Sequence, residues 1–370
     1  MSDIDKLFEK GLIRGKALDN RYVVAPMTRV SAEEDGIANQ RMKEYYERYA
    51  YGGFSAVITE GIYTDQKYSQ GYAFQPGIAN EEQKKAWEPI VNAVKRNGAL
   101  FIAQLMHAGA QSQDNRFVSH TAAPSSIKPP GEQLAFYRGE GEFPEPVELT
   151  YQEIKELKEG FVQAALRSKN AGFDGVELHS ANGYVLDQFL TEATNQRTDG
   201  YGGSLSERLK LLLEIIEEVR EAVGEKFIVG VRISQAKVTD SEYRWPGGEE
   251  DASVIFSSLG KTSLDYIHTT ENDGTAPGFG EGTLTMAGAA KQFSGLPVIA
   301  NGQLAEPDKA AYLITNNDAD FIALGTGALA NPDAPNLIRK NKPLQEFDFE
   351  KIMLPVAYIK DTELKAALTK

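Results

Sequence analysis

The sequence contains no cysteine among its 370 residues. Disulfides, thiolate zinc sites, cysteine nucleophiles and cysteine-held iron–sulfur clusters are therefore excluded. The sequence also lacks an apolar run long enough to cross a bilayer, and its first residues lack the basic and apolar regions of a secretion signal. We therefore expect a cytoplasmic protein. Any redox chemistry must use an organic cofactor, or a metal held by histidines and carboxylates.

Positive charge is scarce as well. The chain has 39 Lys and Arg against 53 Asp and Glu, a net charge of −14. This balance argues against broad contact with nucleic acid or anionic lipid, although it leaves room for a basic pocket that binds one phosphate. Hydrophobic residues at 41% are typical of a globular protein with an ample core, and the length fits one large α/β domain or two ordinary ones.

Short β-branched runs alternate with longer helical patterns along the chain. This order predicts eight strands, at residues 22–25, 56–60, 100–105, 175–178, 228–233, 266–269, 298–301 and 321–324. Helices are predicted between them, among others at 39–50, 81–97, 151–171, 205–223 and 307–316. Two helices begin at capping boxes, Thr150 with Glu153 and Ser204 with Glu207, in which hydroxyl and carboxylate each accept from a backbone amide.

Eight strands each followed by a helix predict an α/β fold, the (β/α)8 TIM barrel, which needs about 250 residues. The surplus residues lie in non-periodic stretches after strands, so they collect at the C-terminal face, where such barrels keep their active sites. The longest stretch is 106–149, and its Pro- and Gly-rich part, 122–146, is long enough for a small hairpin lid after the third strand. We expect one domain over residues 1–370, with a turn and a terminal helix in 343–370.

Three hydrogen-bonding side chains follow the fourth predicted strand: His179, Asn182 and Tyr184. One helical turn would put His179 beside Asn182, so that both could donate to the same ligand oxygen. Tyr184 would share that target only if the chain bends at Gly183. Such a group could polarise a carbonyl and deliver a proton. A structural role for each side chain is the alternative.

Other polar residues are predicted at the barrel mouth or inside it. Pro26 ends the first strand and frees the amides that follow, and Thr28 adds a hydroxyl. Gln104 faces the interior and needs a partner, either a heteroaromatic ligand or a backbone group. Arg232 would be costly to bury alone. It requires either a flat ligand or a salt bridge to a barrel carboxylate such as Glu177.

Glycines follow the last two strands, in Asn301-Gly302 and Gly325-Thr326-Gly327. Barrels often build a phosphate site at these two loops. The second segment also fits a loose dinucleotide-binding pattern, but too little chain follows it to complete a βαβ unit.

A metal-dependent barrel hydrolase is a weaker alternative. His107, His179 and His268 fall near strand ends, and Glu60 could join them as a ligand. No His-x-His or HExxH spacing supports this interpretation.

As a set, these residues resemble the old yellow enzyme family of flavin mononucleotide (FMN) dependent ene-reductases, from about Leu7 to about Pro332. The motifs occur in the family's order. They are Asn20-Arg21, Pro26-Met27-Thr28, Glu60-Gly61, Gln104-Leu105, His179-Ser-Ala-Asn182-Gly-Tyr184, Arg197-Thr-Asp-Gly-Tyr-Gly-Gly203 and Ala300-Asn301-Gly302.

The resemblance implies an NAD(P)H-dependent enzyme that reduces electron-poor alkenes by a ping-pong sequence. His179 and Asn182 would bind the carbonyl or nitro oxygen, and Tyr184 would protonate Cα after hydride transfer from the flavin to Cβ. Arg232 would stabilise the negative charge of the reduced flavin. The other cofactor-binding residues would be Ala25, Pro26, Met27, Thr28, Gly61, Gln104, Asn301, Gly302, Gly325 and Thr326.

The chain also departs from the family pattern. The family usually has Gly-Arg after the last strand, where this chain has Gly325-Thr326, so we expect weaker FMN retention. Met106 and Ala110 stand where relatives often carry other residues, and both positions shape substrate fit. A flavin-binding protein without turnover is therefore a second alternative. The physiological alkene, the choice between NADH and NADPH, and the choice between monomer and homodimer are left open.

Overall fold

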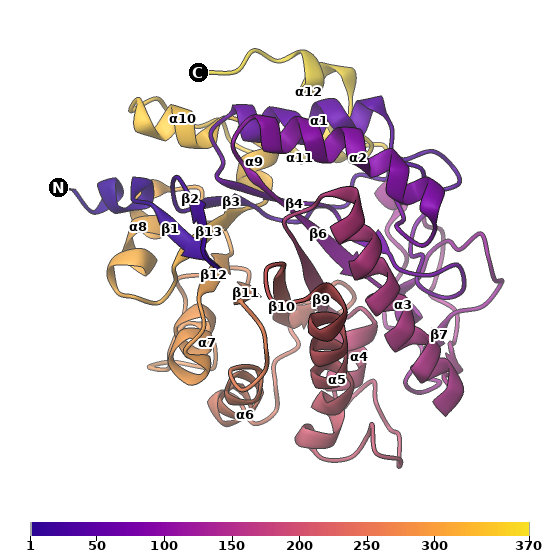
Figure 1. Ribbon diagram of the computed structural model, residues 1–370. Helices are drawn as coiled ribbons and strands as arrows, with labels where there is room; N and C mark the ends of the chain where they lie inside the picture. Colours follow the sequence, from indigo (N-terminus) through magenta and orange to yellow (C-terminus); the bar gives the residue numbers. More distant parts are fainter. Residues whose placement is uncertain (1, 370) are drawn as a thin grey trace.

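The structure, a computed structural model, describes residues 2–369, in which eight parallel strands close a barrel surrounded by helices (Figure 1). The barrel strands are β3 (Tyr22–Val24), β4 (Ala56–Ile58), β6 (Leu100–Met106), β9 (Gly175–Asn182), β10 (Ile228–Lys237), β11 (Tyr266–Thr270), β12 (Val298–Asn301) and β13 (Phe321–Leu324). Each pairs in parallel with the next, and β13 pairs with β3 to close the ring. The predicted (β/α)8 barrel is confirmed. Met1 and Lys370, the ends of the predicted domain, lie outside the described residues.

The larger helices cover the outside of the barrel. They are α1 (Gln40–Tyr51), α2 (Glu81–Arg96), α3 (Tyr151–Ala171), α5 (Leu205–Val223), α6 (Glu249–Leu259), α7 (Met286–Ser294) and α8 (Pro307–Thr315). Both capping boxes are present at the predicted starts of α3 and α5. Thr150, for example, accepts from the Glu153 amide at 3.2 Å, while the Glu153 carboxylate accepts from the Thr150 amide at 3.0 Å. None of the helices in residues 2–369 is long and apolar enough to span a membrane.

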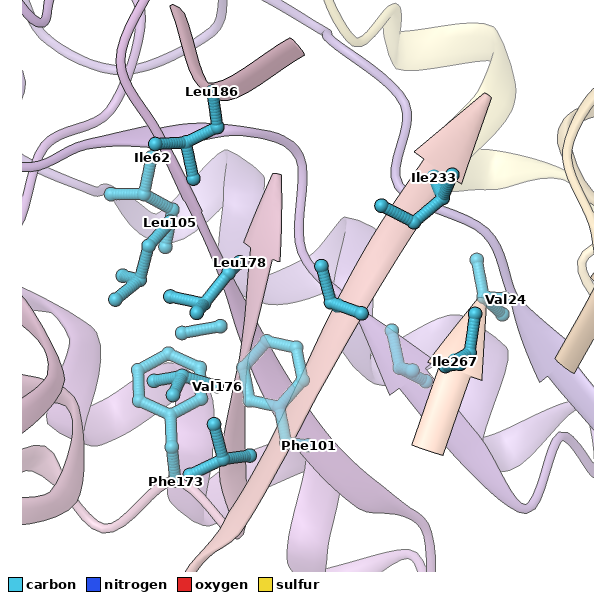
Figure 2. Packing of buried hydrophobic residues seen from close by; sticks show 14 of the residues in the cluster. Val24, Ile62, Phe101, Leu105, Phe173, Val176, Leu178, Leu186, Ile233 and Ile267 are labelled. Carbon is cyan, nitrogen blue, oxygen red and sulfur yellow. The ribbon is translucent and has the colours of Figure 1, made fainter. Parts of the chain in front are cut away.

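Apolar side chains fill the layer between the strands and the helices (Figure 2). Val176 and Leu178 project outward from β9 into this layer, where Phe101 and Phe173 pack with ring centroids 4.8 Å apart. Alternate residues of the same strands face inward, so Glu177 and His179 point into the barrel. On β9, the period of two therefore separates an apolar outer face from a polar inner one.

Two strands run four residues further than the sequence predicts. β9 extends to Asn182 and β10 to Lys237, and these two residues are paired in register. The extensions are polar, so hydrophobic alternation does not reveal them. They form because each strand offers its neighbour backbone partners, with an irregularity between Ile233 and Lys237.

The insertion at residues 106–149 differs in detail from the predicted hairpin lid. Its short strands β7 (Ala122–Ala123) and β8 (Val147–Glu148) pair in parallel, and a single antiparallel bridge joins Glu132 to Glu142. The hairpin is thus reduced to one bridge inside a longer loop.

An N-terminal hairpin, which the sequence analysis does not predict, closes the opposite end of the barrel. Strands β1 (Gly11–Ile13) and β2 (Lys16–Leu18) pair antiparallel. Ile13 and Leu18 pack against inward-facing residues at the starts of barrel strands, among them Ile228 and Tyr266. Ligands must therefore enter from the C-terminal face.

The C-terminal tail crosses that face. In place of one terminal helix it forms two short ones, α11 (Phe349–Met353) and α12 (Asp361–Lys365), after α9 (Thr326–Ala330) and α10 (Ala334–Arg339). The buried guanidinium of Arg29 donates to the Ala357 carbonyl at 3.1 Å and to the Glu363 carboxylate at 2.8 Å. These bonds tie the tail to the segment that follows β3.

Candidate active site

A cavity of about 530 Å³ opens at the C-terminal ends of the barrel strands. Every residue predicted for the site lines it. These residues are Ala25, Pro26, Met27, Thr28, Gly61, Gln104, His179, Asn182, Tyr184, Arg232, Asn301, Gly302, Gly325 and Thr326. They come from loops and strands around the whole ring, so closure of the barrel is what brings them together.

His179 and Asn182 lie on one strand, β9, and the predicted helical turn between them is wrong. Residues three apart on a regular strand point to opposite faces. Here Asn182 and Gly183 take left-handed conformations, with φ of 61° and 84°, which turn the chain. The bend required for Tyr184 is therefore present. It brings the Tyr184 ring to 4.9 Å from the His179 ring, centroid to centroid.

The Tyr184 hydroxyl lies 2.5 Å from that of Tyr72. Burial raises the pKa of Tyr184 to about 12 and that of Tyr72 well above its usual value. Tyr184 is therefore protonated at neutral pH and can donate a proton. Tyr72 was missed because it lies in an irregular loop, where neither periodicity nor a motif distinguishes it.

Within the described residues, the Arg232 guanidinium makes one hydrogen bond, through Nη2. Its Nη2 donates to Asn301 Oδ1 at 2.9 Å, and the same oxygen accepts from the Thr270 hydroxyl. Burial lowers the pKa of Arg232 to about 10, which still leaves it charged at neutral pH.

The alternative partner of Arg232, Glu177, is engaged elsewhere inside the barrel. It accepts from Gln104 and Tyr266 and bonds the Nδ1 of His268, each at 2.9 Å. Burial alone would raise the pKa of Glu177, but the charges and hydrogen bonds around it, led by His268, lower the pKa below its usual value. Gln104 thus finds a carboxylate partner, which the sequence analysis did not predict.

The cavity fits a flat ligand with a polar edge. Among residues 2–369, Arg232 Nε and His179 Nδ1 are buried without a hydrogen-bond partner. Such orphaned atoms are costly unless a ligand satisfies them. A Cβ at Gly61 would lie 2.4 Å from Met106 Sδ, so a larger residue there would require the Met106 side chain to move. The isoalloxazine of FMN, with acceptors along one edge, matches this arrangement.

The metal alternative finds no geometric support in the described part of the chain. No three His, Asp or Glu side chains of residues 2–369 form a group that could hold a metal ion. His268 bonds Glu177 inside the barrel, and His107 Nδ1 accepts from the Gly109 amide at 3.1 Å.

Aromatic residues from two distant segments complete the cavity wall. Phe136 and Tyr137 come from the 106–149 insertion, and Phe347 and Phe349 come from the C-terminal tail. The ring centroids of Phe136 and Phe349 lie 5.5 Å apart, so the insertion and the tail are in contact at the cavity. The lid in the insertion is predicted from the sequence, whereas no pattern in the C-terminal tail indicates that it lines the cavity.

The contribution of His179 to the free energy of unfolding is expected to fall as pH decreases from 7 to 5. Burial lowers the pKa of His179 to about 3, against about 6.5 in an unfolded chain. The unfolded state therefore binds the proton first, and the stability present above pH 6.5 is lost as pH falls toward 3. His179 alone should contribute a loss of about 2 kcal/mol by pH 5. Urea unfolding of the wild type and of His179→Asn at both pH values isolates this contribution. The comparison is needed because burial raises the pKa of Glu60 to about 7, so Glu60 changes stability in the opposite direction in both proteins. A His179→Asn variant with an unchanged pH dependence would contradict the assignment.

Comparison with known proteins gives a consistent result. The NADH:flavin oxidoreductase / NADH oxidase family matches residues 6–345. A probable flavin mononucleotide-dependent alkene reductase from Leishmania infantum is 31% identical over 93% of this chain and 93% of its own length. An NADH oxidase from Thermoanaerobacter brockii is 32% identical over 92% of this chain, but the match spans only 52% of that protein.

The fold agrees. The structure of an old yellow enzyme homologue from Zymomonas mobilis superposes with a TM-score of 0.87 and 27% identity, covering 98% of this chain and 99% of that one. Together with the match over residues 6–345, this shows that the chain belongs to the NADH:flavin oxidoreductase / NADH oxidase family, the family of the old yellow enzymes.

Proposed function

We propose that this protein is an FMN-dependent ene-reductase that reduces the activated C=C bond of α,β-unsaturated carbonyl or nitro compounds with NAD(P)H. The observation that carries the proposal is the meeting of His179, Asn182 and Tyr184 in one cavity with the partly unsatisfied Arg232. The Leishmania relative, described as an FMN-dependent alkene reductase, supports it.

The flavin would be held by residues from several strand ends. Arg232 offers its free Nε and a fixed positive charge, which would stabilise negative charge on the reduced ring. Thr28 and Gln104 would bind the polar edge, and the segment from Ala25 to Met27, with Gly61, would support the ring. When bound, FMN supplies the hydride that the nicotinamide has delivered to it.

His179 and Asn182 would donate to the substrate oxygen. The lowered pKa keeps His179 neutral at pH 7, so it would act as a hydrogen-bond donor and not as an acid. Two donors on one oxygen make the alkene more electrophilic at Cβ. Tyr184, protonated and buried, would give its proton to Cα.

The visible spectrum of the purified protein with FMN tests this proposal. Anaerobic NADPH should bleach the flavin absorbance, and 2-cyclohexenone should restore it. A colourless protein that does not bind added FMN would overturn the proposal. A yellow protein that turns over no electron-poor alkene would favour the non-catalytic flavin-binding alternative.

Phenol binding should depend on His179 and Asn182. A phenolate resembles the oxygen of a bound substrate, so removing one donor should weaken phenol affinity about tenfold to a hundredfold, as loss of a hydrogen bond to a charged group does. Titration of the flavin-loaded His179→Ala and Asn182→Ala variants with phenol, followed by absorbance, measures the change. Unchanged affinity in both variants would remove these residues from the substrate site.

The setting of the enzyme follows from the same proposal. We infer one catalytic domain, because the strands form one closed ring and the insertion and tail both contact the cavity. A small-molecule substrate fits the net charge of −14, which disfavours nucleic acid. We also propose a cytoplasmic location. Both a monomer and a homodimer are compatible with this role.

A further inference from the structure

The active-site cavity is lined by two chemically different groups of residues. Arg232, His179 and Asn182 come from β9 and β10. A second group comes from the loops after β12 and β13, where barrels commonly bind phosphate. This loop group includes Gly302, Gln303, Gly325, Thr326 and Gly327, all of them uncharged.

Among the described lining residues, positive charge is confined to the first group. Arg232 is the one Lys or Arg among the described residues that line the cavity. Arg232 pairs in register with His179 and His268 on the neighbouring strands and donates to Asn301, so its charge is held inside the ring. The lining also includes an acid, Glu271, which bonds Gln235 at 3.4 Å. The loop group can therefore offer a phosphate hydrogen bonds from the Thr326 hydroxyl, the Gln303 side-chain amide and backbone amides, but no positive charge.

This distribution has a consequence for the choice of flavin. Transferring a phosphate dianion from water is costly unless cations neutralise its charge, and the donors of the loop group supply hydrogen bonds without that neutralisation. A ribityl chain that ends in a hydroxyl carries no such cost. The interactions that hold the flavin ring are the same for FMN and for riboflavin. The phosphate should therefore add little net affinity here.

We propose that this site binds riboflavin almost as well as FMN, with dissociation constants that differ by less than about tenfold. The inference rests on the proposed function, because it assumes that the cavity binds a flavin. In this proposal the protein recognises the flavin ring and the ribityl group, and the phosphate contributes little to the affinity.

Fluorescence quenching of free flavin by the flavin-depleted protein tests the inference without any turnover. FMN and riboflavin are titrated separately at the same ionic strength. The expected ratio of the two dissociation constants is below about tenfold. A larger preference for FMN would overturn the inference while leaving the proposed function intact. Failure to bind either flavin would overturn the proposed function itself.

Thr326 allows a matched pair of variants, because its side chain is exposed and a longer one can extend toward solvent. Thr326→Arg should raise FMN affinity at least about tenfold and leave riboflavin affinity unchanged, since the added cation meets only a phosphate. Thr326→Val, which adds no charge, should not raise FMN affinity. An equal gain for both flavins, or no gain for FMN in folded Thr326→Arg, would place the phosphate elsewhere and overturn the inference. If Thr326→Arg misfolds, the ratio of the FMN and riboflavin dissociation constants of the wild type tests the inference by itself.

Discussion

Replacing Tyr184 with phenylalanine is expected to slow alkene reduction by about 10²- to 10⁴-fold, the usual contribution of a positioned general acid. Reduction of the flavin by NADPH needs no proton from this hydroxyl and should proceed at the wild-type rate. The variant keeps the ring that packs 4.9 Å from His179, so the cavity wall is preserved. Stopped-flow absorbance resolves the two half-reactions in one instrument.

A comparison variant separates proton donation from general disturbance. Tyr72→Phe removes the hydroxyl 2.5 Å from that of Tyr184 but leaves the donor in place. Its alkene half-reaction should slow less than that of Tyr184→Phe. Equal slowing of both half-reactions in Tyr184→Phe would show that the residue positions ligands and donates no proton.

A large loss of stability is expected when a buried ion pair, which lies beneath the turn that carries Asn182 and Tyr184, is broken. Lys237 Nζ lies 2.6 Å and 2.7 Å from the two carboxylate oxygens of Asp187. The same carboxylate accepts from the Gly183 amide at 2.7 Å. Burial lowers the pKa of Lys237 and raises that of Asp187, so each group depends on the other to stay charged.

Lys237→Met should reduce the free energy of unfolding by about 3–5 kcal/mol, because it leaves Asp187 buried and unpaired. Urea unfolding at pH 7 measures the loss. The double variant Lys237→Met with Asp187→Asn should recover much of it, since asparagine can still accept from the Gly183 amide without a charge. A single-variant loss below about 1 kcal/mol would contradict the expected dependence. The expectation would also be contradicted if the double variant lost as much unfolding free energy as the two single variants lose together.

The fold was predictable because its signals are local. Strands alternate with helices in eight repeated units, the number that a barrel requires, and Thr150 and Ser204 mark helix starts by their own hydrogen bonds. The site residues were predictable for a related reason. In a barrel, residues after successive strands must meet at one face, whatever their distance along the chain.

Other features depend on contacts that no local pattern encodes. The extension of β9 and β10 requires the two polar strand ends to pair with each other. The contact between Tyr72 and Tyr184 requires an irregular loop to reach a distant turn. The tail comes within reach of the cavity through Arg29, whose partners lie more than 300 residues away.

The sequence by itself thus determined the barrel, the family and the set of residues around one cavity, because periodicity, caps and strand ends are properties of short segments. Only the tertiary structure decided how those residues act. It satisfied Glu177 with Gln104, Tyr266 and His268 and left Arg232 Nε without a hydrogen-bond partner in the described part of the chain. It also buried Tyr184, which raises the pKa of its hydroxyl to about 12. Burial and hydrogen-bond partners set charge and pKa, and both arise only when distant segments pack together.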